Sequence, residues 1–431
     1  MSSPQRIPLN GPSEQLDYIE NLYTIQPEDL FMEKFLRNMQ IKAKERSRKI
    51  FEELKANINL GDPVVQLISG ETRTVFNMYN GISGYAYFFW RASRSEYFSS
   101  AEQEHALYMA DRLLHAAKEN IGSDSSAIGF YRGCSGIYAL QCCILYRQHK
   151  IAEAKMAIDN LLKISEHFIA PAMFQRAVLL GFAGYLISIL FVMKQIPLIQ
   201  EELNLDDILD TERVNSILYQ CFIILTDNES PVIEYSLKQF HYYGAMHGLA
   251  GILFAILHIK DFCLISLYEE KIKNSLEVLI TKGMNENFEL VSSDVSSECF
   301  HHWCRGTPGA ILTFLKAYEV YGDASYLEIA CRCAEKVWEN GLTRTGFTLC
   351  HGIIGNCYTF IHLYQVTKDQ QYLQKALWFY SSLDDPRVTV SVAADDPVGT
   401  LLGKPEYCYS LMEGTSGVGC LSIDLGNPEL A

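Results

Sequence analysis

Two short stretches in the second half of the chain place thiol and imidazole side chains directly before a glycine. They read Trp303-Cys304-Arg305-Gly306 and Leu349-Cys350-His351-Gly352. Zinc prefers thiolate and imidazole ligands, and a catalytic zinc keeps three protein ligands and one open position. Because Cys350 and His351 are adjacent, they need a distant third ligand. Cys304 stands before its glycine as Cys350 does, so these three residues are the predicted ligands of one zinc ion.

A third stretch, Met246-His247-Gly248, adds a histidine that can exchange protons near neutral pH. The competing interpretation is that these side chains only pack or cap helices, which is the usual fate of a lone buried cysteine. We apply that interpretation to six cysteines: Cys142, Cys143, Cys221, Cys263, Cys331 and Cys333. Cys299 and Cys357 lie near the motifs in sequence but are not predicted ligands. His301 and His302 are expected in solvent or behind the ligands.

The stretches belong to a repeat that runs through the chain. Gly-x-x-Gly precedes an apolar segment seven times, with first glycines at Gly81, Gly133, Gly181, Gly248, Gly306, Gly352 and Gly414. Successive copies start between 46 and 67 residues apart. This spacing is too long and too variable for a solenoid with a repeat of about 34 residues. Glycine at a helix start lets neighbouring chains approach closely, and the helix N-terminus offers free N–H groups to an anion.

The segments after each glycine pair are apolar nearly all round, which is typical of helices buried on every side. Between them lie amphipathic segments at 101–120, 326–342 and 372–383. The sequence therefore predicts an all-α fold, a double-layered α/α barrel with seven inner helices that each start at Gly-x-x-Gly. The apolar run 177–193 is interpreted as one of these buried helices, not as a membrane span.

The N-terminal part differs from the repeats. Residues 1–60 are predicted to form a helical segment, with a charged helix around 28–58, that packs on a single barrel domain of residues 61–431. The segment 384–406, which contains two Asp-Asp-Pro sequences, is expected to be irregular because this combination is typical of turns.

Composition excludes several classes. The net charge of −15 argues against nucleic-acid binding and against docking on anionic lipid. The 13 cysteines lack the spacing of a disulfide scaffold, and residues 1–10 have no apolar signal core, which favours a reducing, cytoplasmic location and no transmembrane segment. Peripheral association with a membrane or a signalling protein stays open.

On four motifs the sequence resembles the lanthionine synthetase C-like family, and most of all its eukaryotic glutathione-binding members. The motifs are Gly-Ala-Met-His-Gly-Leu-Ala-Gly (244–251), His-Trp-Cys-Arg-Gly-Thr-Pro-Gly (302–309), Leu-Cys-His-Gly-Ile-Ile-Gly-Asn (349–356) and Tyr-Ser-Leu-Met-Glu-Gly-Thr-Ser-Gly (409–417). The resemblance covers roughly residues 60–425 and implies a seven-fold α/α barrel. It also implies one zinc ion held by Cys304, Cys350 and His351, and an acid/base role for His247.

The resemblance implies a reaction as well: a thiol, here glutathione, adds to dehydroalanine or dehydrobutyrine in peptides or proteins and forms a thioether. It implies that cations hold the glutathione carboxylates. The candidates are Arg6, Arg305, Arg344 and Lys404, with Glu406 in the stretch Gly403-Lys-Pro-Glu406. For each cation, a solvated surface charge is the alternative interpretation. Glu413 in the last motif is expected to orient a ligand or to cap a helix.

The chain departs from the family at several positions. Arg305 stands where the family usually has histidine, and Cys134 where it usually has an aspartate. Phe182, Thr345 and Gly403 replace basic residues. Two hypotheses follow: a glutathione transferase-type enzyme that forms C–S bonds, or a catalytically impaired protein that binds zinc and glutathione or another partner. We expect Arg305 to take over the electrostatic part of the missing histidine's role and to leave proton transfer to His247.

Overall fold

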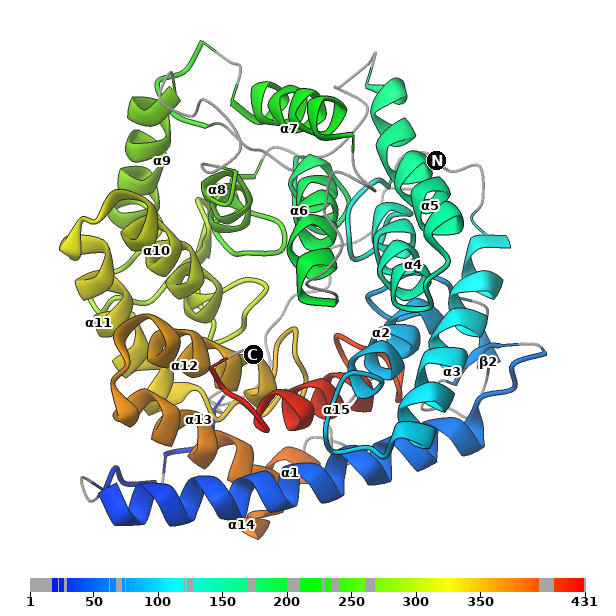
Figure 1. The fold of residues 1–431 in the computed structure, drawn as a ribbon. Helices are drawn as coiled ribbons and strands as arrows, with labels where there is room; N and C mark the ends of the chain where they lie inside the picture. Colours follow the sequence, from blue (N-terminus) through cyan, green and yellow to red (C-terminus); the bar gives the residue numbers. More distant parts are fainter. Residues whose placement is uncertain are drawn as a thin grey trace, which may run out of the picture.

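The computed structural model describes residues 18–21, 23–26, 29–61, 63–66, 72–73, 75–119, 121, 127–168, 176–199, 210–226, 229–233, 240–259, 268–394 and 407–429. Within these residues the helices form two concentric layers (Figure 1). The inner layer consists of α2 (Ile82–Ala92), α4 (Ser135–Arg147), α6 (Phe182–Ile199), α8 (Leu249–Leu257), α10 (Thr307–Tyr321), α12 (Ile353–Thr367) and α15 (Thr415–Asp424). The outer layer includes α3 (Ser100–Glu119), α5 (Ile151–Lys163), α7 (Thr211–Thr226), α9 (Glu269–Thr281), α11 (Ala324–Asn340) and α13 (Gln370–Ser381).

The inner helices close into a circle. Each one packs against the next along the chain, and α15 packs against α2. Each inner helix also packs against the outer helix that follows it, except α15. The long helix α1 (Asp29–Asn57) takes that place, because it packs against α15 and α13 (Figure 1). The seven-fold α/α barrel expected from the repeats is the observed architecture. The division of the chain at residue 60 stays a prediction.

A ring of backbone hydrogen bonds closes one end of the barrel. Its members stand two residues before the first glycine of each repeat: Tyr79, Tyr131, Leu179, Met246, Cys304, Cys350 and Met412. In six of the seven steps the N–H of one member donates to the carbonyl oxygen of the next, from Tyr79 N to Tyr131 O (2.9 Å) round to Met412 N to Tyr79 O (3.1 Å). The step from the second repeat to the third is made by Arg132 N to Leu179 O (3.2 Å). The repeats are therefore joined to one another at equivalent positions.

The second glycine of each pair is required by the turn before its helix. In all seven copies a Cβ at this position would lie 1.8–2.7 Å from the carbonyl oxygen of the residue six positions earlier. The clash is closest at Gly251, against the carbonyl of Ala245. The first glycine is the N-cap of α2, α8, α10, α12 and α15. The N-cap of α4 is Cys134, so this helix begins one residue later in its repeat.

Short strands and further helices complete the described residues. Strands β1 (Val65–Gln66) and β2 (Thr72–Arg73) pair antiparallel, as do β3 (Val291–Ser293) and β4 (Ser296–Cys299). Two 3₁₀ turns, Ile164–His167 and Ser382–Asp384, follow α5 and α13. The expectation of irregular chain at 384–406 is wrong for its first half, where α14 (Pro386–Ala394) forms. No helix among the described residues is long and apolar enough to cross a membrane.

Candidate metal centre at the mouth of the barrel

The backbone ring brings the three predicted zinc ligands together. Cys304 and Cys350 are neighbouring members of the ring, joined by Cys304 N to Cys350 O (3.1 Å). His351 follows Cys350 directly at the start of α12. One ligand atom from each of the three residues lies within 4.8 Å of the others. Cys304 and Cys350 are buried, with 7% and 2% of their surface exposed, whereas His351 is half-buried.

The protonation of this cluster fits a metal ion better than it fits three neutral side chains. A hydrogen bond from the Cys350 thiol holds the pKa of Cys304 below its ordinary value, and His351 adds to this effect. The same contact raises the pKa of Cys350, because two buried thiolates would repel each other. Burial lowers the pKa of His351, but Cys304 and Glu413 raise it to a net value above the ordinary one. A divalent cation removes the conflict, since it binds both sulfurs as thiolates.

Tyr79 and Glu413 support the cluster from the next repeats. The Tyr79 hydroxyl lies 3.0 Å from Cys350 Sγ and 3.1 Å from Glu413 Oε1. Burial, followed by the charges of Cys350 and Glu413, raises the pKa of Tyr79. The hydroxyl therefore stays protonated and can donate a hydrogen bond. A hydrogen bond from a hydroxyl that stays protonated fixes the direction of a sulfur ligand. Glu413 therefore faces the cluster, and the alternative of a helix cap has no contact in its favour among the described residues.

The turn before α8 approaches the backbone of Cys304 closely. A Cβ on Gly244 would lie 2.5 Å from both Arg305 Cα and the Cys304 carbonyl oxygen. Only glycine leaves room for this approach. The turn that carries Gly244 also carries His247, so the close approach places His247 beside the backbone of Cys304 and Arg305.

His247 has a free nitrogen at this place. Its Nδ1 atom is buried and has no hydrogen-bond partner among the described residues. Burial, together with the charges of Arg305 and Arg132, lowers its pKa to about 4. The imidazole is therefore neutral at pH 7 and can accept a proton. An unpaired polar atom in a buried position is costly unless a ligand uses it.

Of the residues predicted to contact glutathione, Arg305 and Arg344 lie within the described part of the chain. Arg305 is exposed, and its charge lowers the pKa of His247 and of His302. Arg344 is half-buried and directly precedes Thr345, whose hydroxyl hydrogen-bonds to the carbonyl oxygen of His351. Arg6, Lys404 and Glu406 lie outside the described residues.

Two residues of the mouth were missed in the sequence. Arg132 holds the position before the first glycine that His247, Arg305 and His351 hold in their repeats. Tyr79 holds the ring position of Cys304 and Cys350. Alignment of the seven repeats on their first glycines would have found both. Search by residue type could not, because neither side chain is a usual zinc ligand.

A cavity of about 370 Å³ adjoins the cluster, lined by Tyr18, Glu289, Cys299, Phe300, His301, His302, Asn340 and Thr343. The His302 ring centre is 5.9 Å from that of His351, and His301 Nε2 lies 3.3 Å from a Glu289 oxygen. Neither histidine belongs to the metal-type cluster, and Cys299 and Cys357 do not either. His302 therefore stands next to the predicted ligand His351.

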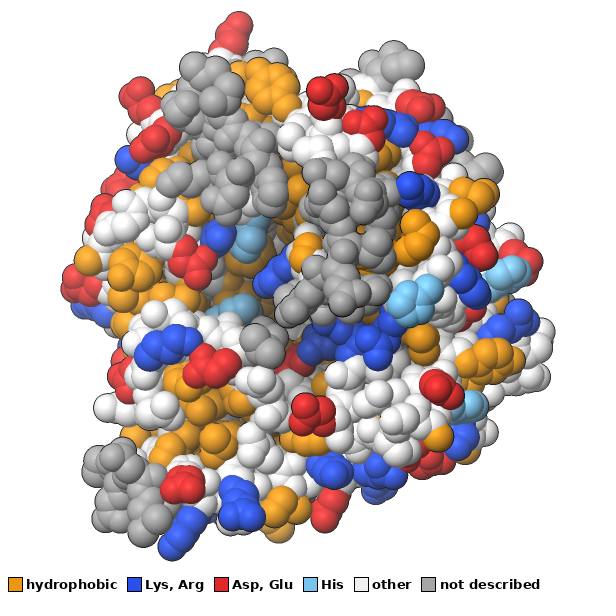
Figure 2. Space-filling model, viewed as in Figure 1, with side chains coloured by type: hydrophobic (Ala, Val, Ile, Leu, Met, Phe, Trp, Pro, Cys, Tyr) orange, Lys and Arg blue, Asp and Glu red, His pale blue; other side chains and the backbone are white. Residues whose placement is uncertain are grey.

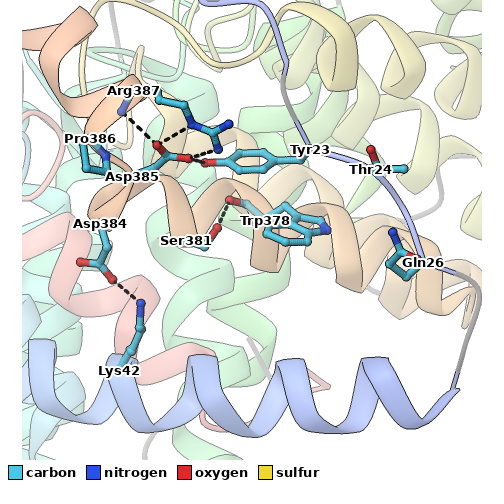
Figure 3. Close-up of a pocket in the computed structure, with 10 residues that line it drawn as sticks. All are labelled: Tyr23, Thr24, Gln26, Lys42, Trp378, Ser381, Asp384, Asp385, Pro386 and Arg387. Carbon is cyan, nitrogen blue, oxygen red and sulfur yellow. Dashed lines mark hydrogen bonds and ion pairs between the residues drawn. The ribbon is translucent and has the colours of Figure 1, made fainter.

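A larger surface pocket of about 580 Å³ lies elsewhere, between α1, α13 and α14 (Figure 3). Its charged groups pair with one another: Arg387 and the Tyr23 hydroxyl bind Asp385, and Lys42 binds Asp384. Tyr23 also stacks on Trp378 at 4.9 Å. No charge of this pocket is left for a ligand, so the smaller mouth site is the functional candidate.

Comparisons with known proteins place the chain in a family and find a solved structure with the same fold. The family model of the lanthionine synthetase C-like proteins matches residues 73–431. A protein of Danio rerio named "Glutathione S-transferase LANCL1" is 29% identical over 235 residues, which span 52% of this chain and 56% of that protein. The solved structure of nisin cyclase covers 89% of this chain and 94% of its own, with a TM-score of 0.61 at 12% identity, and so shares the fold. This chain belongs to the lanthionine synthetase C-like family.

Proposed function

We propose that this protein binds one zinc ion through Cys304, Cys350 and His351, and adds the thiol of glutathione to dehydroalanine or dehydrobutyrine residues of peptides or proteins. The cluster of three ligand atoms within 4.8 Å carries the proposal. The zebrafish relative's name supports the choice of glutathione, although the match covers little more than half of that protein. A cytoplasmic location and the contacts of Arg6, Arg344, Lys404 and Glu406 with glutathione stay predictions.

The donor set fits zinc, because two sulfurs and one imidazole leave one position open. Zinc bound there would lower the pKa of a substrate thiol, so that the thiol reacts as a thiolate at neutral pH. The chain's own residues then have two tasks. They must hold the thiol donor and the alkene together, and they must move one proton.

His247 is suited to the proton transfer. Its low pKa leaves the imidazole neutral at pH 7, so the ring can hold the proton that the thiol loses only briefly and then releases it readily. The sulfur then bonds to the β-carbon, and the electron pair of the double bond moves towards the carbonyl group as an enolate. The protonated imidazole returns the proton to the α-carbon. The net change is addition of S–H across the double bond, with no proton gained or lost.

The second hypothesis, a binding protein without turnover, also has an observation in its favour. The family's usual aspartate in the second repeat is Cys134 here, and burial raises the pKa of this thiol to about 11. Cys134 therefore stays neutral and supplies no carboxylate. If the reaction needs that acid, this chain retains only the binding of zinc and glutathione.

The test is incubation of zinc-loaded protein with glutathione and a dehydroalanine-containing peptide, followed by mass spectrometry. We expect a peptide adduct that carries one glutathione. Elemental analysis should find one zinc ion per chain in the wild type, and none in Cys304→Ala and Cys350→Ala. Cys357→Ala is the matched control, since Cys357 is a buried cysteine near the ligands that is not part of the cluster.

Stoichiometric zinc in both ligand variants would contradict the ligand set. Zinc binding without any adduct in the wild type would favour the second hypothesis.

A further inference from the structure

Arg132 lies at the mouth of the barrel, and in the reaction as proposed it only adds to the effect of burial and of Arg305 that lowers the pKa of His247. It stands directly before Gly133, in the turn that leads into α4. Its backbone N–H supplies one step of the backbone ring, to Leu179 O at 3.2 Å. Its side chain is exposed and is not needed for that bond.

The two mouth arginines approach the metal-type cluster from different repeats. The Arg132 guanidinium lies over the Tyr79 ring, 5.1 Å from its centre, and the Tyr79 hydroxyl reaches Cys350 Sγ. Arg305 follows Cys304 directly. The charges of both arginines act on His247. The cluster and His247 therefore lie within the field of both cations.

No carboxylate among the described residues balances these two charges. The chain has 51 acidic and 36 basic residues, yet no carboxylate forms an ion pair with Arg132 or Arg305 within the described part. Glu413, the acidic residue of the mouth, contacts Tyr79. Both arginines also precede the starts of inner helices, where the positive end of the helix dipole makes a cation unfavourable. The contact with the Tyr79 ring gives Arg132 one structural partner, but no carboxylate among the described residues pairs with either arginine.

We propose that Arg132 and Arg305 form a clamp for the carboxylates of the thiol substrate, one carboxylate to each guanidinium, a site that rests on the proposed reaction for the identity of that substrate. A guanidinium offers paired donors that match a carboxylate, and two of them leave room for one carboxylate each. Glutathione carries two carboxylates. The clamp supplies the positive charge that is missing at Thr345 and Gly403, and it distinguishes acidic thiols from neutral ones.

Binding is measured first, with a ligand that cannot react. S-methylglutathione keeps both carboxylates and lacks a free thiol, so calorimetry with zinc-loaded protein reports on the clamp alone. We expect Arg132→Ala to raise the dissociation constant about ten- to hundredfold, and Arg305→Ala to do the same. Arg132→Lys keeps the charge and should recover part of the affinity. Arg112→Ala, on an exposed face of α3, is the control and should bind like the wild type.

Kinetics separate the clamp from a structural role. With glutathione, Arg132→Ala should raise KM and change kcat little. With 2-mercaptoethanol, which has no carboxylate, the same variant should show a much smaller rise in KM than with glutathione. The zinc content of Arg132→Ala should stay at one per chain. Loss of zinc would show that Arg132 acts through Tyr79 and Cys350, and would contradict the clamp.

The outcomes distinguish the clamp from the reaction. If no adduct forms but S-methylglutathione binds and Arg132→Ala weakens it, the clamp holds and the proposed reaction fails. If the wild type forms the adduct while Arg132→Ala keeps both its affinity for S-methylglutathione and its KM for glutathione, the clamp is wrong and the reaction stands. Absence of any binding of S-methylglutathione to the wild type also overturns the clamp.

Discussion

The arginines at the two ends of the barrel differ in whether they have a hydrogen-bond acceptor. At the far end, where the inner helices finish, each arginine has an acceptor: Arg91 binds the Asp424 carboxylate, Arg94 the Gln195 side chain at 2.7 Å, and Arg147 the Ser93 carbonyl oxygen at 2.8 Å. Figure 2 shows Lys and Arg side chains gathered over α2 and α4, with histidines nearby. At the mouth, Arg132 and Arg305 have no such acceptor among the described residues.

The helix dipole explains this difference. All inner helices run in the same direction, so their negative ends meet at the far end and their positive ends at the mouth. Cations at the negative ends stabilise the fold, by about 0.3–1 kcal/mol each at exposed sites. Cations at the positive ends do the opposite, which agrees with the proposal that the two arginines of the mouth bind a ligand. The far end is therefore expected to serve stability, and the mouth to serve binding and chemistry.

The largest effect is expected for His247→Ala. If His247 moves the proton, its loss should lower kcat for the glutathione adduct by about 10²- to 10⁴-fold. Zinc content and affinity for S-methylglutathione should not change. The matched variant at the far end is His362→Gln, which removes another histidine of low pKa and should leave kcat unchanged. Equal loss of turnover in both variants would break the distinction between the two ends.

Asp424→Asn tests the far end. Asp424 is 4% exposed and accepts hydrogen bonds from Arg91 and from the Tyr358 hydroxyl. Loss of one partner of a buried pair costs about 3–5 kcal/mol. We expect the lower end of this range, because 24% of the Arg91 side chain is exposed. The midpoint of urea unfolding should fall, while zinc content stays at one per chain. A normal midpoint combined with loss of turnover would place function at the far end instead.

The smallest effect is the dependence of stability on pH. Burial is the largest cause that lowers the pKa of His258 and of His362, each to about 4. In the unfolded chain a histidine takes up its proton near pH 6.5. The unfolded state therefore binds more protons between these values, and stability should fall as the pH drops from about 6.5 towards 4.

His258→Gln should reduce this slope by about one proton, measured from urea midpoints at a series of pH values. The difference should amount to about 1–2 kcal/mol between pH 7 and pH 5. A slope that does not respond to the substitution would mean that His258 titrates normally in the folded state.

The sequence predicted the barrel closely, because one local signal repeats seven times. The helix expected at 28–58 is Asp29–Asn57, and the segment 101–120 is the helix Ser100–Glu119. The three residues of the metal-type cluster were picked out for the same reason, since each stands at a fixed distance from its glycine. The dipeptide Asp384-Asp385 was interpreted as part of a turn, but the Asp385 carboxylate accepts the N–H of Arg387 and so caps α14, with Pro386 in the first turn.

What the sequence could not show is which side chains act on the ligands from other repeats. Tyr79 is 271 residues from Cys350 in sequence, and their contact follows from closure of the ring. The low pKa of His247 also needs the fold, because it depends on burial and on charges from two other repeats. The residue type is enough to predict a metal ligand. The side chains that contact this ligand depend on how the ring of repeats closes.

Because the ring of backbone hydrogen bonds is closed, it has no first or last member. The bond from Met412 to Tyr79 joins the last repeat to the first, so every repeat has two neighbours. An open solenoid can gain or lose a unit at its end, since each unit contacts only the units beside it. A closed ring cannot, because removal of one unit leaves a donor and an acceptor unpaired on either side. The number of repeats is therefore fixed, and the contact of Tyr79 with Cys350 exists only when the circle has closed.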